Sequence, residues 1–150
     1  MTETPETTAE HALAGAAALL DAGPGPARAR TVVRLLRHAL EMAVDTYWEV
    51  VRPGEVVGRS RRGRQIRLLV AVLDHPTAHG IYATWCMLSD AARPHPYDLA
   101  ATVGELRALQ AAVTRQLAAL AEATSAAGAV RTGPASGSSS IARTGAAPSA

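Results

Sequence analysis

Apolar residues recur every three or four positions over long stretches of this chain, which is the spacing of one face of an α-helix. The strongest early stretch begins near Pro26, whose fixed φ suits a first helical turn. Its apolar positions are Val33, Leu36, Leu40, Val44, Tyr47 and Val51. Arg52-Pro53-Gly54 is typical of a helix end, so the pattern predicts one long helix over 26–52.

Three more helices are predicted between residues 60 and 122. Ser60 is a candidate N-cap for the first of them, whose inward positions are Ile66, Leu69, Val70 and Leu73. The next runs from about Pro76 to Ala92, with Ile81, Tyr82, Trp85 and Leu88 inward. Thr102 and Glu105 have the spacing of a capping box for the last one. Its apolar stripe is Val103, Leu106, Leu109, Val113, Leu117 and Leu120.

The two ends of the chain differ from this middle part. Residues 1–25 form an acidic segment in which Thr7-Thr8-Ala9-Glu10 has capping-box spacing, so we expect a short helix from Thr7 to Asp21 whose docking the sequence leaves open. The first six residues, and residues 125–150 with their Ala, Gly, Ser and Pro, are typical of disorder. We therefore predict an all-α protein, an antiparallel four-helix bundle over 26–124 with disordered termini.

Composition narrows the function classes. The 150 residues include 33 alanines, no Phe and a single cysteine, Cys86, which excludes an internal disulfide framework and a Cys-rich zinc site. No uncharged apolar run reaches the roughly 18–20 residues that span a bilayer, and the acidic N-terminus lacks the basic region of a secretory signal. We expect a cytoplasmic protein that does not enter membranes. His75 and His79 lack a third ligand, and no nucleotide-binding or hydrolase motif occurs, so neither metal nor cofactor is predicted.

Charge is unevenly distributed, although the chain carries a net charge of only +2. All 15 basic residues are arginines, and five of them form a dense cluster at the start of the helix predicted after Ser60: Arg59, Arg61, Arg62, Arg64 and Arg67. Guanidinium groups and the N–H groups of a helix start both bind phosphate oxygens. The cluster is either a weak, sequence-independent binding site for nucleic acid and other anions or a solvated helix start.

The connection between the last two predicted helices holds the second candidate site. Arg93, His95 and Tyr97 lie close together in the sequence, followed by Asp98. A histidine that titrates near neutral pH, a phenol and a guanidinium could serve as acid, base and phosphate ligand. The same residues are also ordinary in a connecting loop, where Tyr97 would pack on the bundle and Asp98 would cap the next helix.

Two segments, RTVVRLLRHALEMAVDTYW and WCMLSDAARPHPYDLAATVGEL, resemble small proteins of high-GC bacteria that are related to the HEPN helical domains. The resemblance covers residues 28–120 and implies a helical bundle. HEPN domains include ribonuclease toxins as well as non-catalytic nucleotide-binding or scaffolding members. The catalytic members carry an Arg followed, after four to six residues, by a His near the start of the last helix. No Arg–His pair in this sequence has that spacing.

Two functions follow from these observations. The first is a non-catalytic helical interaction module whose partner is an unknown protein or a second copy of the chain, with anions bound by the arginine cluster. The alternative is a HEPN-type RNA-acting enzyme that uses Arg93, His95 and Tyr97. The absence of the HEPN catalytic spacing favours the interaction module.

Overall fold

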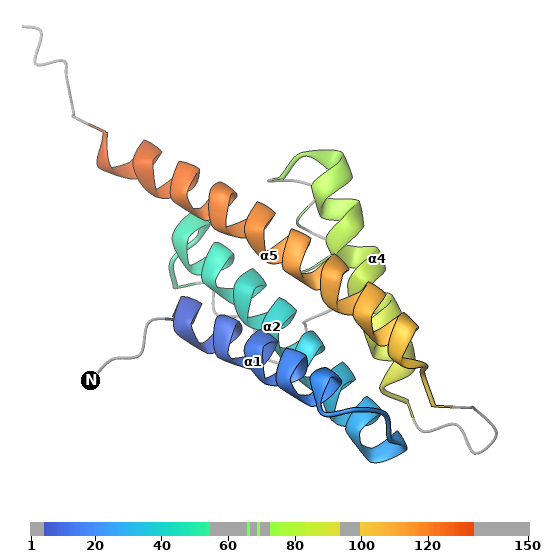
Figure 1. Cartoon of the computed structure of the whole chain (residues 1–150). Helices are drawn as coiled ribbons and strands as arrows, with labels where there is room; N and C mark the ends of the chain where they lie inside the picture. The colour runs from blue at the N-terminus through green and yellow to red at the C-terminus, as the bar shows by residue number, and fades with distance from the viewer. Residues whose placement is uncertain (1–4, 55–65, 67–68, 70–72, 94–99, 134–150) are drawn as a thin grey trace, which may run out of the picture.

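The computed structural model describes residues 5–54, 66, 69, 73–93 and 100–133. This part of the chain contains four α-helices and no strand (Figure 1). They are α1 (Pro5–Asp21), α2 (Pro26–Val51), α4 (His75–Ala91) and α5 (Val103–Thr132). The all-α four-helix fold predicted from the sequence is confirmed. The four described helices include α1, which was predicted outside the bundle, while most of the helix predicted after Ser60 lies outside the described residues.

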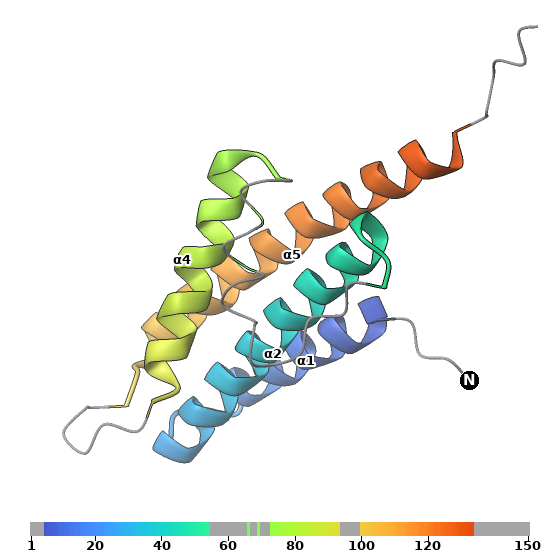
Figure 2. The same cartoon turned by 180° about the vertical axis from the view of Figure 1, so that it is seen from behind.

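α2 lies at the centre of the bundle and contacts α1, α4 and α5. Figures 1 and 2 show that successive labelled helices run in opposite directions, so α2 and α5 lie side by side and point the same way. The first turns of α2 and α5 are therefore at one end of the bundle, where α4 also ends. This end carries the site described below.

Apolar side chains from all four helices form one core. The inward positions predicted for α2 from Val33 to Tyr47 are buried. Several of the inward positions predicted for α4 and α5 are buried as well. Fully or almost fully buried among them are Val33, Leu36, Leu40, Val44, Tyr47, Ile81, Leu88, Leu106, Val113 and Leu120. Ile66 and Leu69 are also fully buried, whereas most of the helix predicted around them lies outside the described residues.

The helix predicted from Thr7 to Asp21 is confirmed as α1, and it is an integral part of the bundle. It begins at Pro5, two residues before the predicted capping box, and it buries Ala9, Ala12, Ala16 and Leu20. Alanine adds little to an apolar stripe, yet it has the highest helix propensity and its small side chain lets helices pack closely. The alanine-rich face therefore docks α1 firmly where the sequence left its docking open.

α5 continues to Thr132, eight residues beyond the predicted end of the bundle at Thr124. Most of these additional residues are exposed, and Arg131 Nη1 donates a hydrogen bond of 2.8 Å to the Val50 carbonyl at the end of α2. The high helix propensity of alanine extends the helix with little tertiary packing. The predicted disordered tail is therefore wrong for 125–132, and residues 134–150 lie outside the described part.

The helix starts differ in how they are capped. The capping box predicted for α5 is confirmed, because Glu105 N donates to Thr102 Oγ1 at 3.2 Å and Thr102 N donates to Glu105 Oε2 at 2.7 Å. Asp74 caps α4 by accepting a hydrogen bond of 3.0 Å from Thr77 N. α2, in contrast, follows Gly25, which has no side chain and therefore offers no side-chain oxygen to the first N–H groups of the helix.

Candidate functional site

A groove of about 790 Å³ opens at the end of the bundle where α2 and α5 begin and α4 ends. We call it the α2–α4–α5 groove, because residues of all three helices line it. Its apolar lining includes Ala29 and Val33 of α2, Met87 of α4, and Leu109 and Ala112 of α5. Ligand sites in proteins typically measure about 300–1,000 Å³ and combine an apolar lining with a few polar groups.

Five charged side chains also line the groove: Arg30, Asp90, Arg93, Glu105 and Arg115. Both carboxylates already have partners. Asp90 Oδ1 lies 3.9 Å from Arg93 Nη1, and the Glu105 carboxylate accepts hydrogen bonds from the backbone N and hydroxyl of Thr102. These hydrogen bonds hold the pKa of the Glu105 carboxyl below its ordinary value, so it stays ionised in the cap at neutral pH. The charged groups of the groove therefore carry a net charge of one positive.

Arg30 and Arg115 make no hydrogen bond or ion pair with any described residue. Their neighbours in sequence differ in this respect. Arg28 donates to two backbone carbonyls in the turn before α2, and Arg37 and Arg107 form ion pairs with carboxylates. A free guanidinium can bind a carboxylate or phosphate through two parallel hydrogen bonds. The groove thus presents two such groups, one from α2 and one from α5.

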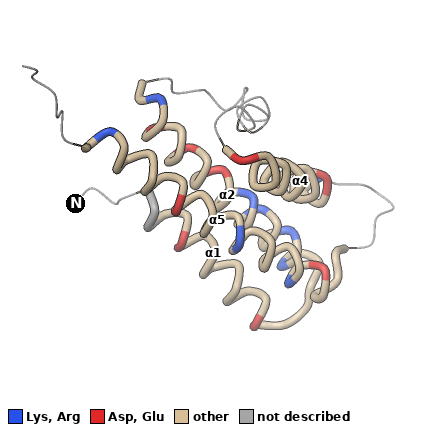
Figure 3. The backbone as a smooth tube through the Cα atoms, turned by 90° about the horizontal axis from the view of Figure 1, so that it is seen from above, with Lys and Arg blue, Asp and Glu red and all other residues tan. Residues whose placement is uncertain are grey.

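The charges of α2 are arranged against the dipole of the helix. Its first twelve residues include four arginines and no acid, while its acidic residues, Glu41, Asp45 and Glu49, all lie in the second half. Figure 3 shows this separation along α2, with the basic positions of α2 close to those of α5. Because a helix N-terminus carries partial positive charge, each exposed arginine close to it is unfavourable by about 0.3–1 kcal/mol. The arginines near the groove thus do not serve the stability of α2.

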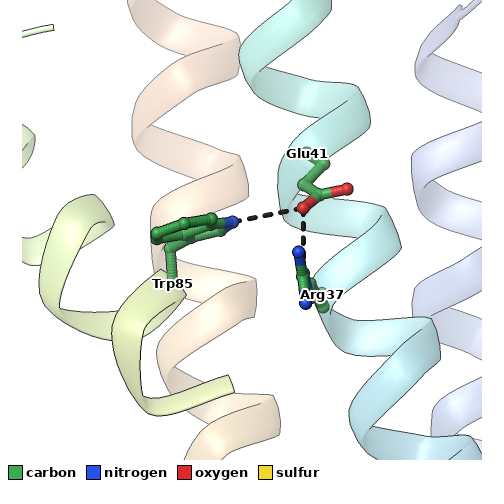
Figure 4. Close-up of polar contacts among 3 residues, drawn as sticks. All are labelled: Arg37, Glu41 and Trp85. Atoms are coloured by element: carbon green, nitrogen blue, oxygen red, sulfur yellow. Dashed lines mark hydrogen bonds and ion pairs between the residues drawn. The ribbon is translucent and has the colours of Figure 1, made fainter. Parts of the chain in front are cut away.

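A polar cluster connects α2 to α4 (Figure 4). Glu41 Oε1 accepts hydrogen bonds from Arg37 Nε at 2.9 Å and from Trp85 Nε1 at 3.2 Å. The Arg37 guanidinium also lies 5.6 Å from the centre of the Trp85 ring, within the range of a cation–π interaction. These contacts fix the position of α4, and with it Met87 and Asp90 of the groove. The Arg37–Glu41 spacing was visible in the sequence, but the partner on α4 was not.

The residues predicted as candidate sites are only partly described. Arg93 is exposed at the rim of the groove, while His95 and Tyr97 lie outside the described residues. Both residues that flank their segment, Arg93 and Ala100, line the groove. The predicted anion-binding cluster also lies outside the described part of the chain: Arg59, Arg61, Arg62, Arg64 and Arg67.

The described residues include no group of three or more His, Cys, Asp or Glu side chains that could bind a metal ion. His75 and His79 are in ring contact at the start of α4, with their centroids 4.3 Å apart. Cys86, the single cysteine of the chain, is half-buried. No helix in the described ranges has the length and apolar character needed to cross a membrane.

Comparison with known proteins adds no family or relative to this picture. No family model matches the chain, and no match to it is found among curated proteins or solved structures.

Proposed function

We propose that this protein is a non-catalytic helical interaction module and that the α2–α4–α5 groove is its binding surface. The observation that carries the proposal is a pair of guanidinium groups, those of Arg30 and Arg115, that have no partner among the described residues and lie beside an apolar lining. Such a surface favours a partner with an apolar body and an anionic group, because the body displaces water from the lining while the anion binds the arginines.

The described lining offers little for catalysis, which supports a binding role. General acid–base catalysis requires a titratable group within hydrogen-bonding reach of the reacting atoms. Asp90 is paired with Arg93, and Glu105 is committed to the cap of α5. The two remaining charged residues are arginines, which stay protonated and bind anions rather than transfer protons.

Anilinonaphthalene sulfonate is a suitable probe, because it combines an aromatic body with one sulfonate. We expect saturable binding to the full chain, with a rise in dye fluorescence. The double variant Arg30→Ala, Arg115→Ala should bind several-fold more weakly, since each exposed charge pair contributes about 0.2–1 kcal/mol. Arg34→Ala is the matched control, because Arg34 is an exposed arginine on α2 that does not line the groove. Equal affinity in the double variant, or an equal loss in the control, would contradict the proposal.

A second function, an RNA-acting enzyme of the HEPN type, is favoured by the position of Arg93 on the same groove as Arg30 and Arg115. In this alternative Arg93 binds a phosphate while His95 and Tyr97 transfer protons. Expression of such an enzyme in bacteria should arrest growth, and His95→Ala should relieve the arrest. Normal growth during strong expression of the folded protein would exclude this function.

The arginine cluster at 59–67 is a separate proposal for anion binding. Binding to nucleic acid through charge alone should depend steeply on salt, with a log–log slope of roughly −4 for four or five phosphate contacts. Replacement of any one of the five arginines by alanine should change the slope by about one unit. A flat salt response would leave the cluster as a solvated helix start.

A further inference from the structure

We propose that the occupant of the α2–α4–α5 groove is an acidic amphipathic helix of a protein partner. This inference rests on the proposed function and adds the class of partner. Its basis is the shape of the groove walls, the placement of the charges around them and the exposed methionine at the edge.

The walls of the groove are formed by helix faces with small side chains. On α5 the lining positions run from Glu105 to Arg115 at intervals of one and three residues, which places them on one face. Ala108 and Ala112 lie at its middle, and Ala29 faces the same groove from α2. Alanine allows the axis of another helix to approach closely. The eleven residues from Glu105 to Arg115 span about 15 Å along α5, the length of roughly three helical turns.

The charges around the groove favour a partner helix that carries carboxylates on both sides of its apolar stripe. Arg30 on α2 and Arg115 on α5 belong to two different walls, so a partner helix that lies in the groove can pair with both. The N-termini of α2 and α5 are at this end of the bundle and add partial positive charge, which the C-terminus of α4 offsets only in part. A nucleic acid fits less well, because its sugar–phosphate backbone would leave the apolar lining uncovered and the described lining has no aromatic ring for base stacking.

Met87 is one of the two large apolar residues that are most exposed among the described residues, with 50% of its surface accessible, and it lines the groove. Methionine side chains are flexible and polarizable, and they are frequent on surfaces that bind partner helices. An apolar side chain of the partner would cover Met87 and remove its exposed surface from water.

The test uses a fluorescein-labelled synthetic peptide of about four helical turns, with a Leu/Ala stripe flanked by glutamates on both sides. A second peptide has the same composition in a scrambled order that abolishes the stripe. Fluorescence anisotropy with the full chain should show saturable binding of the first peptide and at least about tenfold weaker binding of the second. The Arg30→Ala, Arg115→Ala variant should bind the amphipathic peptide about tenfold more weakly, and Arg34→Ala should bind within about twofold of the unchanged protein. Met87→Ser should also weaken binding without changing its salt dependence.

The outcomes separate this inference from the proposed function. Binding of anilinonaphthalene sulfonate in the groove, without binding of the peptide, overturns the helical partner and leaves the proposed function standing. Equal binding of the two peptides also overturns it, because simple charge attraction would then suffice. Displacement of the peptide by a single-stranded RNA at lower concentration than by unlabelled peptide would assign the groove to nucleic acid. Failure of both the dye and the peptide would remove the inference and the proposed function together.

Discussion

At the scale of single residues, replacement of Arg30 should change the binding affinity and the stability of the fold in opposite directions. It lies one turn into α2 and four positions before Arg34. A glutamate at this position would match the helix dipole and could pair with Arg34, so Arg30→Glu should stabilise the fold by about 0.3–1 kcal/mol. The same change should weaken the binding of anilinonaphthalene sulfonate more than Arg30→Ala does. Thermal unfolding and dye titration of the two variants check this; a variant with unchanged affinity would exclude Arg30 from the site.

Two glycines should respond in opposite ways to replacement by alanine. At Gly15 in α1 an added Cβ would lie 3.5 Å from Leu35 Cδ1, an ordinary contact, so Gly15→Ala should stabilise the protein by about 0.5–1 kcal/mol. Gly54 after α2 has φ +85°, and alanine there should destabilise by about 1–2 kcal/mol. Urea unfolding of both variants measures the difference. Stabilisation by both, or destabilisation by both, would contradict these backbone assignments.

At the scale of elements, the caps of α4 and α5 make stability depend on acidity. Hydrogen bonds from Thr77 lower the pKa of Asp74, and those from Thr102 lower the pKa of Glu105. Each ionised carboxylate therefore stabilises its helix start at neutral pH. This stabilisation is lost as the pH falls from the ordinary values, 3.8 for Asp74 and 4.5 for Glu105, through the lower values of the folded state.

The double variant Asp74→Asn, Glu105→Gln should be less stable at neutral pH, and its stability should fall less between about pH 5 and pH 3 than that of the unchanged protein. Urea unfolding over this range provides the measurement, and Glu122→Gln, at an exposed position in the second half of α5, serves as a control outside both caps. If the double variant and the unchanged protein lose stability in parallel, the two caps are not the source of the acid sensitivity.

The sequence predicts those elements whose inward face consists of large residues. The faces of α2 and α5 were correct because Leu and Val at helical spacing leave little choice of orientation. α1 and the last eight residues of α5 were underestimated, because alanine and glycine resemble a linker in composition. In α1 the same alanines form a buried face, and in α5 their helix propensity alone continues the helix.

The candidate site could be predicted only in part, because it depends on how distant helices meet. Arg93 was singled out for its neighbours in sequence, and it does line the groove. Arg30 and Arg115 are 85 positions apart, and nothing in the local sequence indicates that α2 and α5 run side by side. The density of arginines at 59–67 predicted an anion site there instead, because the sequence shows which charges are close along the chain but not which charged side chains have partners in the fold.

At the scale of the whole molecule, the bundle brings two helix starts and one helix end together around the α2–α4–α5 groove. α2 packs against every other labelled helix, and the Arg37–Glu41–Trp85 cluster fixes α4 beside it. The groove is thus built on rigid elements, and its open guanidinium groups lie on helices rather than on loops. This arrangement is suited to binding with little rearrangement of the backbone.

The central claim is that the groove is the binding surface, and amide chemical-shift mapping of the full chain during titration with anilinonaphthalene sulfonate tests it most directly. We expect the perturbed amides to cluster at 27–33, 87–93 and 105–115, and the perturbations to disappear in the Arg30→Ala, Arg115→Ala variant. Perturbations centred on 59–67, or on the face of α1, with the groove amides unchanged, would contradict the claim.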